Sequence, residues 1–125
     1  MEFISTDQAS QPGGHYSQAT VYNGLVFVSG QLPITPDGEK VLGSIEEQTR
    51  LVLDNVKAIL EAADSGLDHV LKSTVYVSDV SNWGKVNEVY TEYFGAHRPA
   101  RAVVPTGPLH YGFLIEMEVV AAQKE

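Results

Sequence analysis

The sequence predicts one α+β domain over residues 1–125, with strands and helices in the order β-β-β-α-β-α-β-β. Two stretches, 45–64 and 82–94, repeat apolar residues at the spacing of an amphipathic helix. The other apolar runs are short, rich in Val, Ile, Tyr and Phe, and bounded by Gly, Pro or Asn, which is typical of strands. Two helices can cover only one face of a six-stranded sheet, so a single helix layer is expected.

Three strands are predicted in the N-terminal third: a short one around Phe3 and Ile4, one over 15–22 and one over 25–30. The second and third are joined by Asn23-Gly24, the strongest signal for a two-residue hairpin turn. Apolar residues follow one another from Leu25 to Val28, which predicts that both faces of the third strand are buried. Residues 31–42 contain Pro and Asp-Gly turn signals and are expected to form a loop.

The first helix is the best-defined element of the sequence. Ser44 and Glu47 match a capping box, in which the serine caps the amide of residue 47 and the glutamate reaches back. One face of the helix then carries Ile45, Thr49, Val52, Val56, Ile59, Leu60 and Ala63. The helix is expected to end near Asp64, with Gly66 in the left-handed conformation that follows many helices.

The second half of the chain adds a strand over 69–78 and a helix over about 82–94. Gly84 lies inside this second helix and weakens it by about 1 kcal/mol relative to alanine. Arg98-Pro99 ends the helical stretch, and two final strands follow, joined by the loop 106–112.

Arg101 and Glu116 are the chemical groups that stand out in these last strands. Alternation places Glu116 and Glu118 on one face with Leu114 and Val120. The opposite face, expected to be the core face, carries Phe113, Ile115, Met117 and Val119. If the two strands are neighbours, the guanidinium and the carboxylate could hold a small acid beside a water. The alternative is a structural cross-strand Arg–Glu pair.

Composition narrows the range of functions. The net charge of −8, without any cluster of Lys and Arg, argues against a nucleic-acid partner. Cysteine is absent and the four histidines are scattered, so neither thiol chemistry nor a metal site is expected. There is no signal-peptide pattern and no apolar run long enough for a membrane span, which predicts a soluble cytoplasmic protein without a membrane partner. The successive apolar residues at 25–28 and at Val103-Val104 predict an oligomer, because the helices leave one face uncovered.

Several motifs together resemble a known family. They are Gly14-His15-Tyr16-Ser17-Gln18-Ala19, Val28-Ser29-Gly30-Gln31-Leu32-Pro33, the stretch 48–63, Val86-Asn87-Glu88-Val89-Tyr90, Pro99-Ala100-Arg101 and Ile115-Glu116-Met117-Glu118. In this order and spacing they resemble the reactive intermediate (enamine/imine) deaminases, the RidA/YjgF-like proteins also labelled L-PSP endoribonucleases. The resemblance implies a chorismate-mutase-like fold with a six-stranded, mostly antiparallel sheet and two helices on one face. It also implies a homotrimer whose sheets close into a central barrel, with a site in each cleft between subunits.

The resemblance further implies hydrolysis of 2-aminoacrylate and related imines to 2-oxo acids and ammonia, without a cofactor. The family's catalytic arginine and glutamate fall on Arg101 and Glu116. Arg101 is then expected to hold the substrate carboxylate, and Glu116 to orient the attacking water. The positions that match the family's cleft are Tyr16, Ser29, Gly30 and Asn87.

Two departures from the family pattern concern the expected site. His15 stands where proline is common, and the loop 106–112 differs, which makes His110 and Tyr111 additional candidate site residues. Two other functions remain open: an endoribonuclease or translation inhibitor, and a non-catalytic module that binds small acids or partner proteins. The presence of both Arg101 and Glu116 favours the deaminase, since binding alone would not require the carboxylate.

Overall fold

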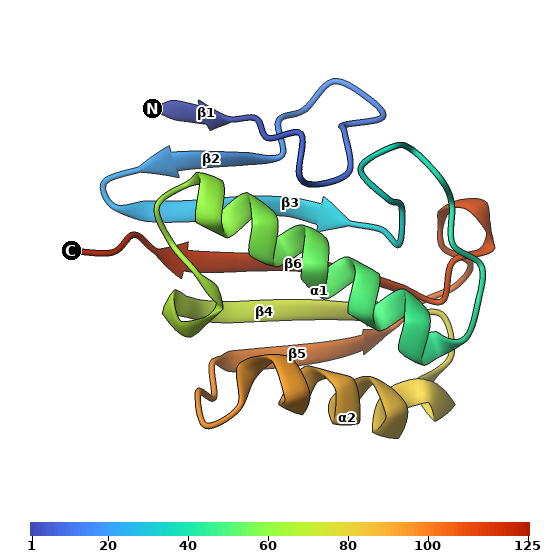
Figure 1. Ribbon diagram of the computed structural model, residues 1–125. Helices are drawn as coiled ribbons and strands as arrows, with labels where there is room; N and C mark the ends of the chain where they lie inside the picture. Colours follow the sequence, from blue (N-terminus) through green and yellow to red (C-terminus); the bar gives the residue numbers. More distant parts are fainter.

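A single mixed sheet and two helices on one of its faces make up the computed structural model, which describes residues 1–125 (Figure 1). The strands are β1 (Glu2–Ile4), β2 (Ala19–Tyr22), β3 (Leu25–Gln31), β4 (Val70–Val77), β5 (Ala100–Pro105) and β6 (Ile115–Ala122). The helices are α1 (Ile45–Ala62) and α2 (Trp83–Phe94). In space the strands lie in the order β1-β2-β3-β6-β4-β5, and only the β4–β5 pair is parallel. The predicted order, fold class and mostly antiparallel sheet are confirmed.

Both helices lie on the same face because of the direction in which the chain crosses the sheet. β3 and β4 are each antiparallel to β6, which lies between them, so β3, β4 and β5 all run the same way. α1 connects β3 to β4 and α2 connects β4 to β5, which are two successive steps toward the same edge. Right-handed crossovers in one direction place their helices on one face, and the other face stays open.

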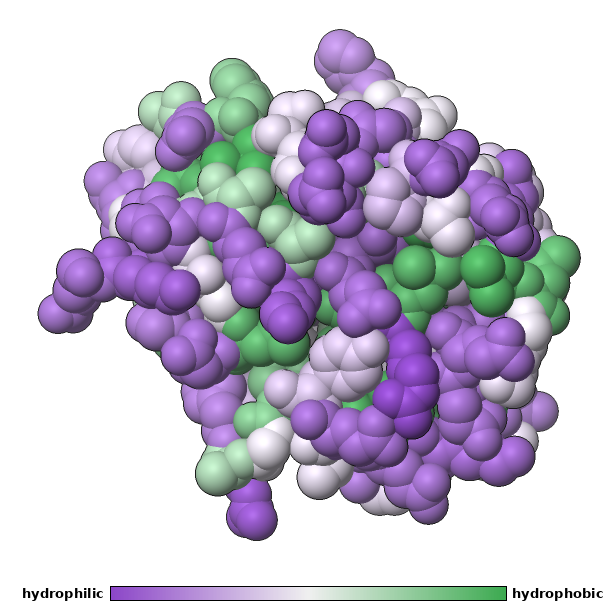
Figure 2. Space-filling view, viewed as in Figure 1, coloured by the Kyte–Doolittle hydropathy of each residue, from purple (hydrophilic) through white to green (hydrophobic).

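The core fills the space between this sheet face and the helices. Along β6, Ile115, Met117 and Val119 are buried while the residues between them are only partly covered, as the alternation predicts. On α1 the predicted apolar stripe is buried, from Ile45 to Leu60. Seen from the helix side, the surface is mostly hydrophilic, with apolar side chains visible in separate patches (Figure 2).

The open face carries apolar side chains that the chain itself does not cover. Leu25 and Phe27 are 36% and 45% exposed, while Val26 and Val28, which alternate with them, are buried. The prediction that both faces of this strand are buried is therefore wrong for a single chain, because no helix packs on the second face. The inference that the uncovered face is partly hydrophobic is confirmed, and Phe3 and Tyr22 on the neighbouring strands extend the patch.

The start of α1 agrees with the sequence, and its end does not. Ser44 caps the helix by accepting a hydrogen bond from the Glu47 amide, at 3.1 Å. The Glu47 carboxylate accepts from the Ser44 hydroxyl instead of from the Ser44 amide. After the helix, Asp64 takes the left-handed conformation (φ 58°), whereas Gly66 is extended (φ −176°). Aspartate tolerates this region better than most residues, so the turn comes two residues before the predicted position.

Two strands begin later than expected. β2 starts at Ala19, because residues 14–17 turn back on themselves through a hydrogen bond from the Tyr16 amide to the Gly14 carbonyl. β4 starts at Val70, because His69 belongs to a short 3₁₀ turn that follows α1.

Two buried amides on α1 hold the loops at one end of the sheet. Asn55 accepts a hydrogen bond from the Ser10 amide at 3.2 Å and donates to the Ile34 carbonyl at 2.8 Å. Gln48 accepts a hydrogen bond from the Leu114 amide at 2.9 Å. Three loops far apart in sequence are thereby fixed to one helix. No helix of this fold combines the length and the apolar content that crossing a bilayer requires.

Replacing Asn55 by alanine should lower the free energy of unfolding by about 1–3 kcal/mol, because two backbone groups lose their buried partner. Alanine is the better helix former, so any loss must come from these tertiary hydrogen bonds. Denaturant unfolding measures the effect, and Lys57→Ala on the exposed face of the same helix is the control. A stability of Asn55→Ala equal to that of the control would contradict the assigned role.

Candidate functional site

The predicted site residues fall into two groups on opposite sides of the sheet. The Arg101 group comprises Arg101 with Asn87 and Tyr90, in a cavity of about 510 Å³ between α2 and β5. The Glu116 group comprises Glu116 with Gly30, Tyr76, Leu109 and Glu118, around a cavity of about 230 Å³ on the open face. The structure thus brings each residue into a defined setting without joining the two groups.

Arg101 lies on the edge strand β5 with its side chain turned toward α2. Its guanidinium donates a hydrogen bond to Asn87 Oδ1 at 2.9 Å and lies over the Tyr90 ring, 4.7 Å from the centroid. The Tyr90 hydroxyl is itself fixed by Ser73 at 2.6 Å. The ion pairs within the chain are Arg50–Glu92 and His69–Asp68, so Arg101 is positioned by neutral groups and has no carboxylate partner.

Glu116 lies on the central strand β6, facing away from the helices. The β3–β6 pairing is interrupted between Val28 and Gln31, so Ser29 and Gly30 form an irregularity opposite it. A Cβ atom on Gly30 would overlap Glu116 Oε2, which explains why a residue without a side chain occupies this position. Burial raises the pKa of the Glu116 carboxyl, the nearby His110 lowers it, and Glu118 raises it.

The two glutamates on this face, Glu116 and Glu118, differ in their hydrogen bonding. Glu118 accepts a hydrogen bond from the Tyr76 hydroxyl at 2.6 Å, and this bond raises the pKa of Tyr76. Glu116 accepts no hydrogen bond from a protein group within the chain, so its oxygens are free to meet a ligand or a water. Of the two carboxylates, Glu116 is therefore the one suited to chemistry.

The expectation that Arg101 and Glu116 lie on adjacent strands is wrong, because β4 lies between β5 and β6. Arg101 pairs with Ser73 of β4, and Glu116 pairs with Tyr76 on its other side. The two Cα atoms are therefore roughly 14 Å apart, and the side chains point to opposite faces. Within one chain they form neither a joint site nor a structural pair.

The other predicted cleft residues have mixed roles. Tyr16 is exposed in the loop before β2, and its hydroxyl accepts a hydrogen bond from the Gly13 amide at 3.2 Å. Ser29 donates its hydroxyl to the Ser17 carbonyl at 2.7 Å, so it holds that loop in place. Asn87 supports Arg101, as described above. Tyr16 and Ser29 line a separate hollow that includes Glu118, next to the Glu116 group, and Asn87 belongs to the Arg101 group.

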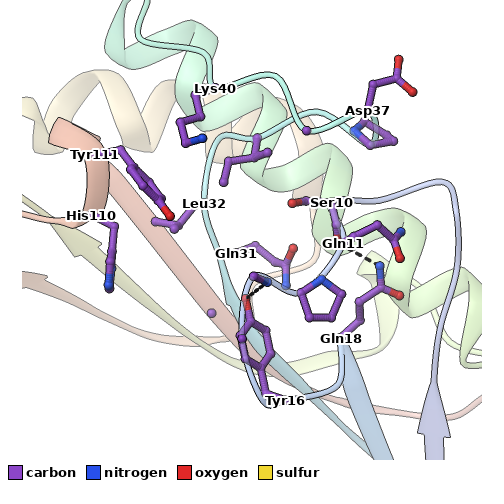
Figure 3. A pocket seen from close by; sticks show the side chains of 17 residues that line it. Ser10, Gln11, Tyr16, Gln18, Gln31, Leu32, Asp37, Lys40, His110 and Tyr111 are labelled. Atoms are coloured by element: carbon purple, nitrogen blue, oxygen red, sulfur yellow. Dashed lines mark hydrogen bonds between the residues drawn. The ribbon is translucent and has the colours of Figure 1, made fainter.

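A third cavity, of about 560 Å³, adjoins the Glu116 group and shares Gly30 with it. His110 and Tyr111, both predicted as candidates, line it together with Tyr16 (Figure 3). Sequence reasoning missed Lys40, which lies in this cavity with its ammonium 4.6 Å from the centroid of the Tyr111 ring. Nothing in the local sequence marks this lysine, since it stands in a loop of mixed polar and apolar residues and its neighbour Tyr111 is distant in the chain.

The buried amides Gln48 and Asn55, which hold the loops around these cavities, were also missed as positioning residues. Their signal was available, because both lie three or four residues from buried apolar positions of α1. No three His, Asp or Glu side chains gather as a metal ion would require.

Comparison with known proteins gives consistent matches. The family model described as Endoribonuclease L-PSP matches residues 6–123. A RutC family protein of Pyrococcus abyssi is 50% identical over 121 residues, covering 96% of this chain and 95% of that protein. A solved structure from Thermotoga maritima superposes with a TM-score of 0.96 at 47% identity, covering 100% of this chain and 99% of the other. The structure of Escherichia coli TdcF with bound serine superposes with a TM-score of 0.94 at 34% identity, covering 99% and 100%.

Gly30→Ala should displace the Glu116 carboxylate, because the added Cβ would overlap its oxygen. The oxygen is at the end of a flexible side chain, so the cost in stability should stay below about 1 kcal/mol. The ¹³C NMR signal and acid titration of the Glu116 carboxyl measure the displacement. Gly107→Ala is the control, since a Cβ there meets nothing within 4 Å. A Glu116 signal unchanged in Gly30→Ala would contradict the close approach.

Proposed function

The chain belongs to the RidA/YjgF family, whose model is described as Endoribonuclease L-PSP, and on this premise we propose that it hydrolyses reactive imines and enamines of small 2-amino acids. The substrates are compounds such as 2-aminoacrylate, and the products are 2-oxo acids and ammonia. The observation that carries the proposal is the pair of incomplete half-sites: a guanidinium without a carboxylate partner and a half-buried carboxylate without a hydrogen-bond donor.

A second copy of the chain is needed to unite the two half-sites. Arg101 lies on an edge strand and Glu116 lies on an open face with the exposed apolar side chains Leu25 and Phe27. Burying those side chains against another copy removes apolar surface from water, and it can bring the Arg101 group of one copy to the Glu116 group of the next. The proposed assembly is a homotrimer with three such shared sites.

Each half-site supplies a different part of the reaction. The planar guanidinium of Arg101, already oriented by Asn87 and Tyr90, binds the substrate carboxylate through two parallel hydrogen bonds. Glu116 accepts a proton from a water, whose oxygen attacks the electrophilic imine carbon. Glu116 returns this proton to the substrate nitrogen, which gives the carbinolamine, and the carbinolamine hydroxyl then loses its proton to nitrogen through the same carboxylate as the C–N bond breaks, which releases ammonia and leaves the 2-oxo acid. An enamine such as 2-aminoacrylate first moves its N–H proton to C3 to become the imine.

The demands on the protein are modest, because an imine carbon is already electrophilic and water is the only second reactant. Positioning the substrate and one proton relay are then the main contributions to the rate. The structure of the relative TdcF contains bound serine, a small amino acid whose carboxylate is of the kind that Arg101 would hold. That relative supports a ligand of the proposed size and charge.

The name endoribonuclease attached to the family model receives less support from this chain. The net charge is −8, and the fixed positive charges that line the candidate cavities are Lys40 in one and Arg98 and Arg101 in the other, too few to form a stripe that could follow a phosphate backbone. General acid–base cleavage of RNA commonly uses two imidazoles, one as acid and one as base. His110 is the one histidine beside Glu116, so this pair of imidazoles is not found there.

Substitution of Arg101 should lower imine hydrolysis in the order wild type, Arg101→Lys, Arg101→Ala. Lysine keeps the charge but loses the planar two-pronged contact, and alanine loses both. The assay couples the protein to an enzyme that releases 2-aminoacrylate and follows 2-oxo acid formation. Melting temperature and light scattering are measured in parallel, because the loss should occur in a folded assembly. Full activity in a folded Arg101→Ala protein would reject the proposed function.

Mixing two inactive variants tests whether the site is shared between chains. Arg101→Ala keeps Glu116, and Glu116→Gln keeps Arg101, so a mixed trimer contains some sites with both native groups. After unfolding and refolding together at equal amounts, about a quarter of wild-type activity should return, since each site draws its two groups independently from neighbouring chains. Light scattering must give the mass of a trimer. No recovery from well-folded mixed trimers would show that the two groups do not act in one shared site.

A further inference from the structure

The cavity that contains Lys40 lies where the side chain of a bound substrate would extend. Gly30 borders both this cavity and the smaller one around Glu116, so the two spaces are neighbours, and the Glu116 carboxylate lies against Gly30 between them. A substrate whose imine carbon faces Glu116 can place its remaining atoms beside this carboxylate, in the neighbouring cavity. The volume of about 560 Å³ is far larger than the methylene group of 2-aminoacrylate requires.

The polar side chains that line this cavity are mostly committed to the protein itself. Gln18 donates to the carbonyls of Thr6 and Ser10, and Gln11 donates to the carbonyls of Thr6 and Ala9. The Gln31 amide donates to the Ser29 carbonyl. These groups form the wall, and they leave few donors that point to a ligand.

Among the lining residues whose side chains donate no hydrogen bond to the protein, Lys40 carries the fixed positive charge. Its ammonium is in no ion pair and donates no hydrogen bond to a protein group, so its three donors are available. Asp37 is the other lining residue with a fixed charge, and Figure 3 shows its carboxylate directed away from the remaining lining side chains. The charge that faces the cavity is therefore positive, although the chain as a whole is acidic.

Lys40 is an exposed residue whose backbone is fixed and whose ammonium lies over one aromatic ring. The backbone of Lys40 pairs with Ile34 in an isolated antiparallel bridge, and the Val41 amide donates to the Pro33 carbonyl, which closes the base of the loop. On the other side, the Tyr111 ring lies under the ammonium at 4.6 Å. Tyr111 itself has φ 58°, an unfavourable region for a bulky side chain, and its ring packs edge-on against Phe113. A strained residue is thus held where it presents its ring to Lys40.

We propose that this cavity binds the side chain of the substrate and selects imines with an acidic side chain, as formed from dicarboxylic amino acids. Arg101 of a neighbouring copy holds the 2-carboxylate, and Lys40 pairs with the second carboxylate at the far end. This inference rests on the proposed imine hydrolysis and adds the substrate class. An apolar side chain would meet Leu32 and Ile34 in the same cavity, but it would leave the ammonium without a partner.

The test compares imines generated in the assay from alanine, leucine and glutamate by amino-acid oxidases, with kcat/KM determined for each. The wild-type protein should prefer the glutamate-derived imine. Lys40→Met, which removes the charge and keeps the length, should lower the ratio of the glutamate-derived to the alanine-derived rate by about tenfold. Lys57→Met, on the exposed face of α1, removes the same charge elsewhere and should leave that ratio unchanged. Lys40→Glu should reverse the order between acidic and uncharged substrates.

The outcomes separate this inference from the proposed function. Hydrolysis of the alanine-derived imine without a preference for the acidic one, or an unchanged ratio in Lys40→Met, would overturn the assignment of Lys40 and leave the deaminase proposal intact. A preference for the leucine-derived imine would assign the cavity to apolar side chains and would equally overturn it. If the wild-type protein hydrolyses none of the three imines, the proposed function fails and this inference fails with it.

Discussion

The handedness of two chain crossovers determines most of what is distinctive in this molecule. Because β3, β4 and β5 run the same way and are taken in one direction across the sheet, α1 and α2 must share a face. One side of the sheet is then a packed core, and the other exposes Leu25 and Phe27 to solvent. Arg101 faces the helix side and Glu116 faces the open side, so the same topological constraint that leaves a bare face also divides the candidate site.

Uncharged side chains hold the two halves of the candidate site in place. On one side, Asn87 and Tyr90 orient Arg101 without neutralising it. On the other, Asn55 and Gln48 fix the loops that shape the space around Glu116 and Lys40. Amides suit this work because they satisfy buried backbone groups and add no charge that would compete for a carboxylate ligand.

The sequence was a good guide to features that depend on local periodicity. The apolar stripe of α1, its Ser44 cap and the alternation along β6 follow from residues close together in the chain, and all three are confirmed. The neighbours of a strand are set by long-range pairing, so the insertion of β4 between β5 and β6 was not foreseen. The same limit applies to Lys40, whose relation to Tyr111 joins loops that are distant in sequence. The end of α1 differs from the prediction because Asp64, and not Gly66, takes the left-handed conformation that either residue can adopt.

The edge position of β5, with Arg101 on it, has a consequence for how the protein would behave on dilution. If the protein is the proposed trimer, a separated chain has an Arg101 group and a Glu116 group that do not face each other. Such a chain can bind the substrate carboxylate or accept a proton from water, but it cannot complete a turnover. Below the dissociation constant of the assembly, specific activity would then rise with the square of the total protein concentration and level off above it. A rise in the amount of the protein would in that case be enough to raise its specific activity cooperatively, without an effector, a modification or a moving segment.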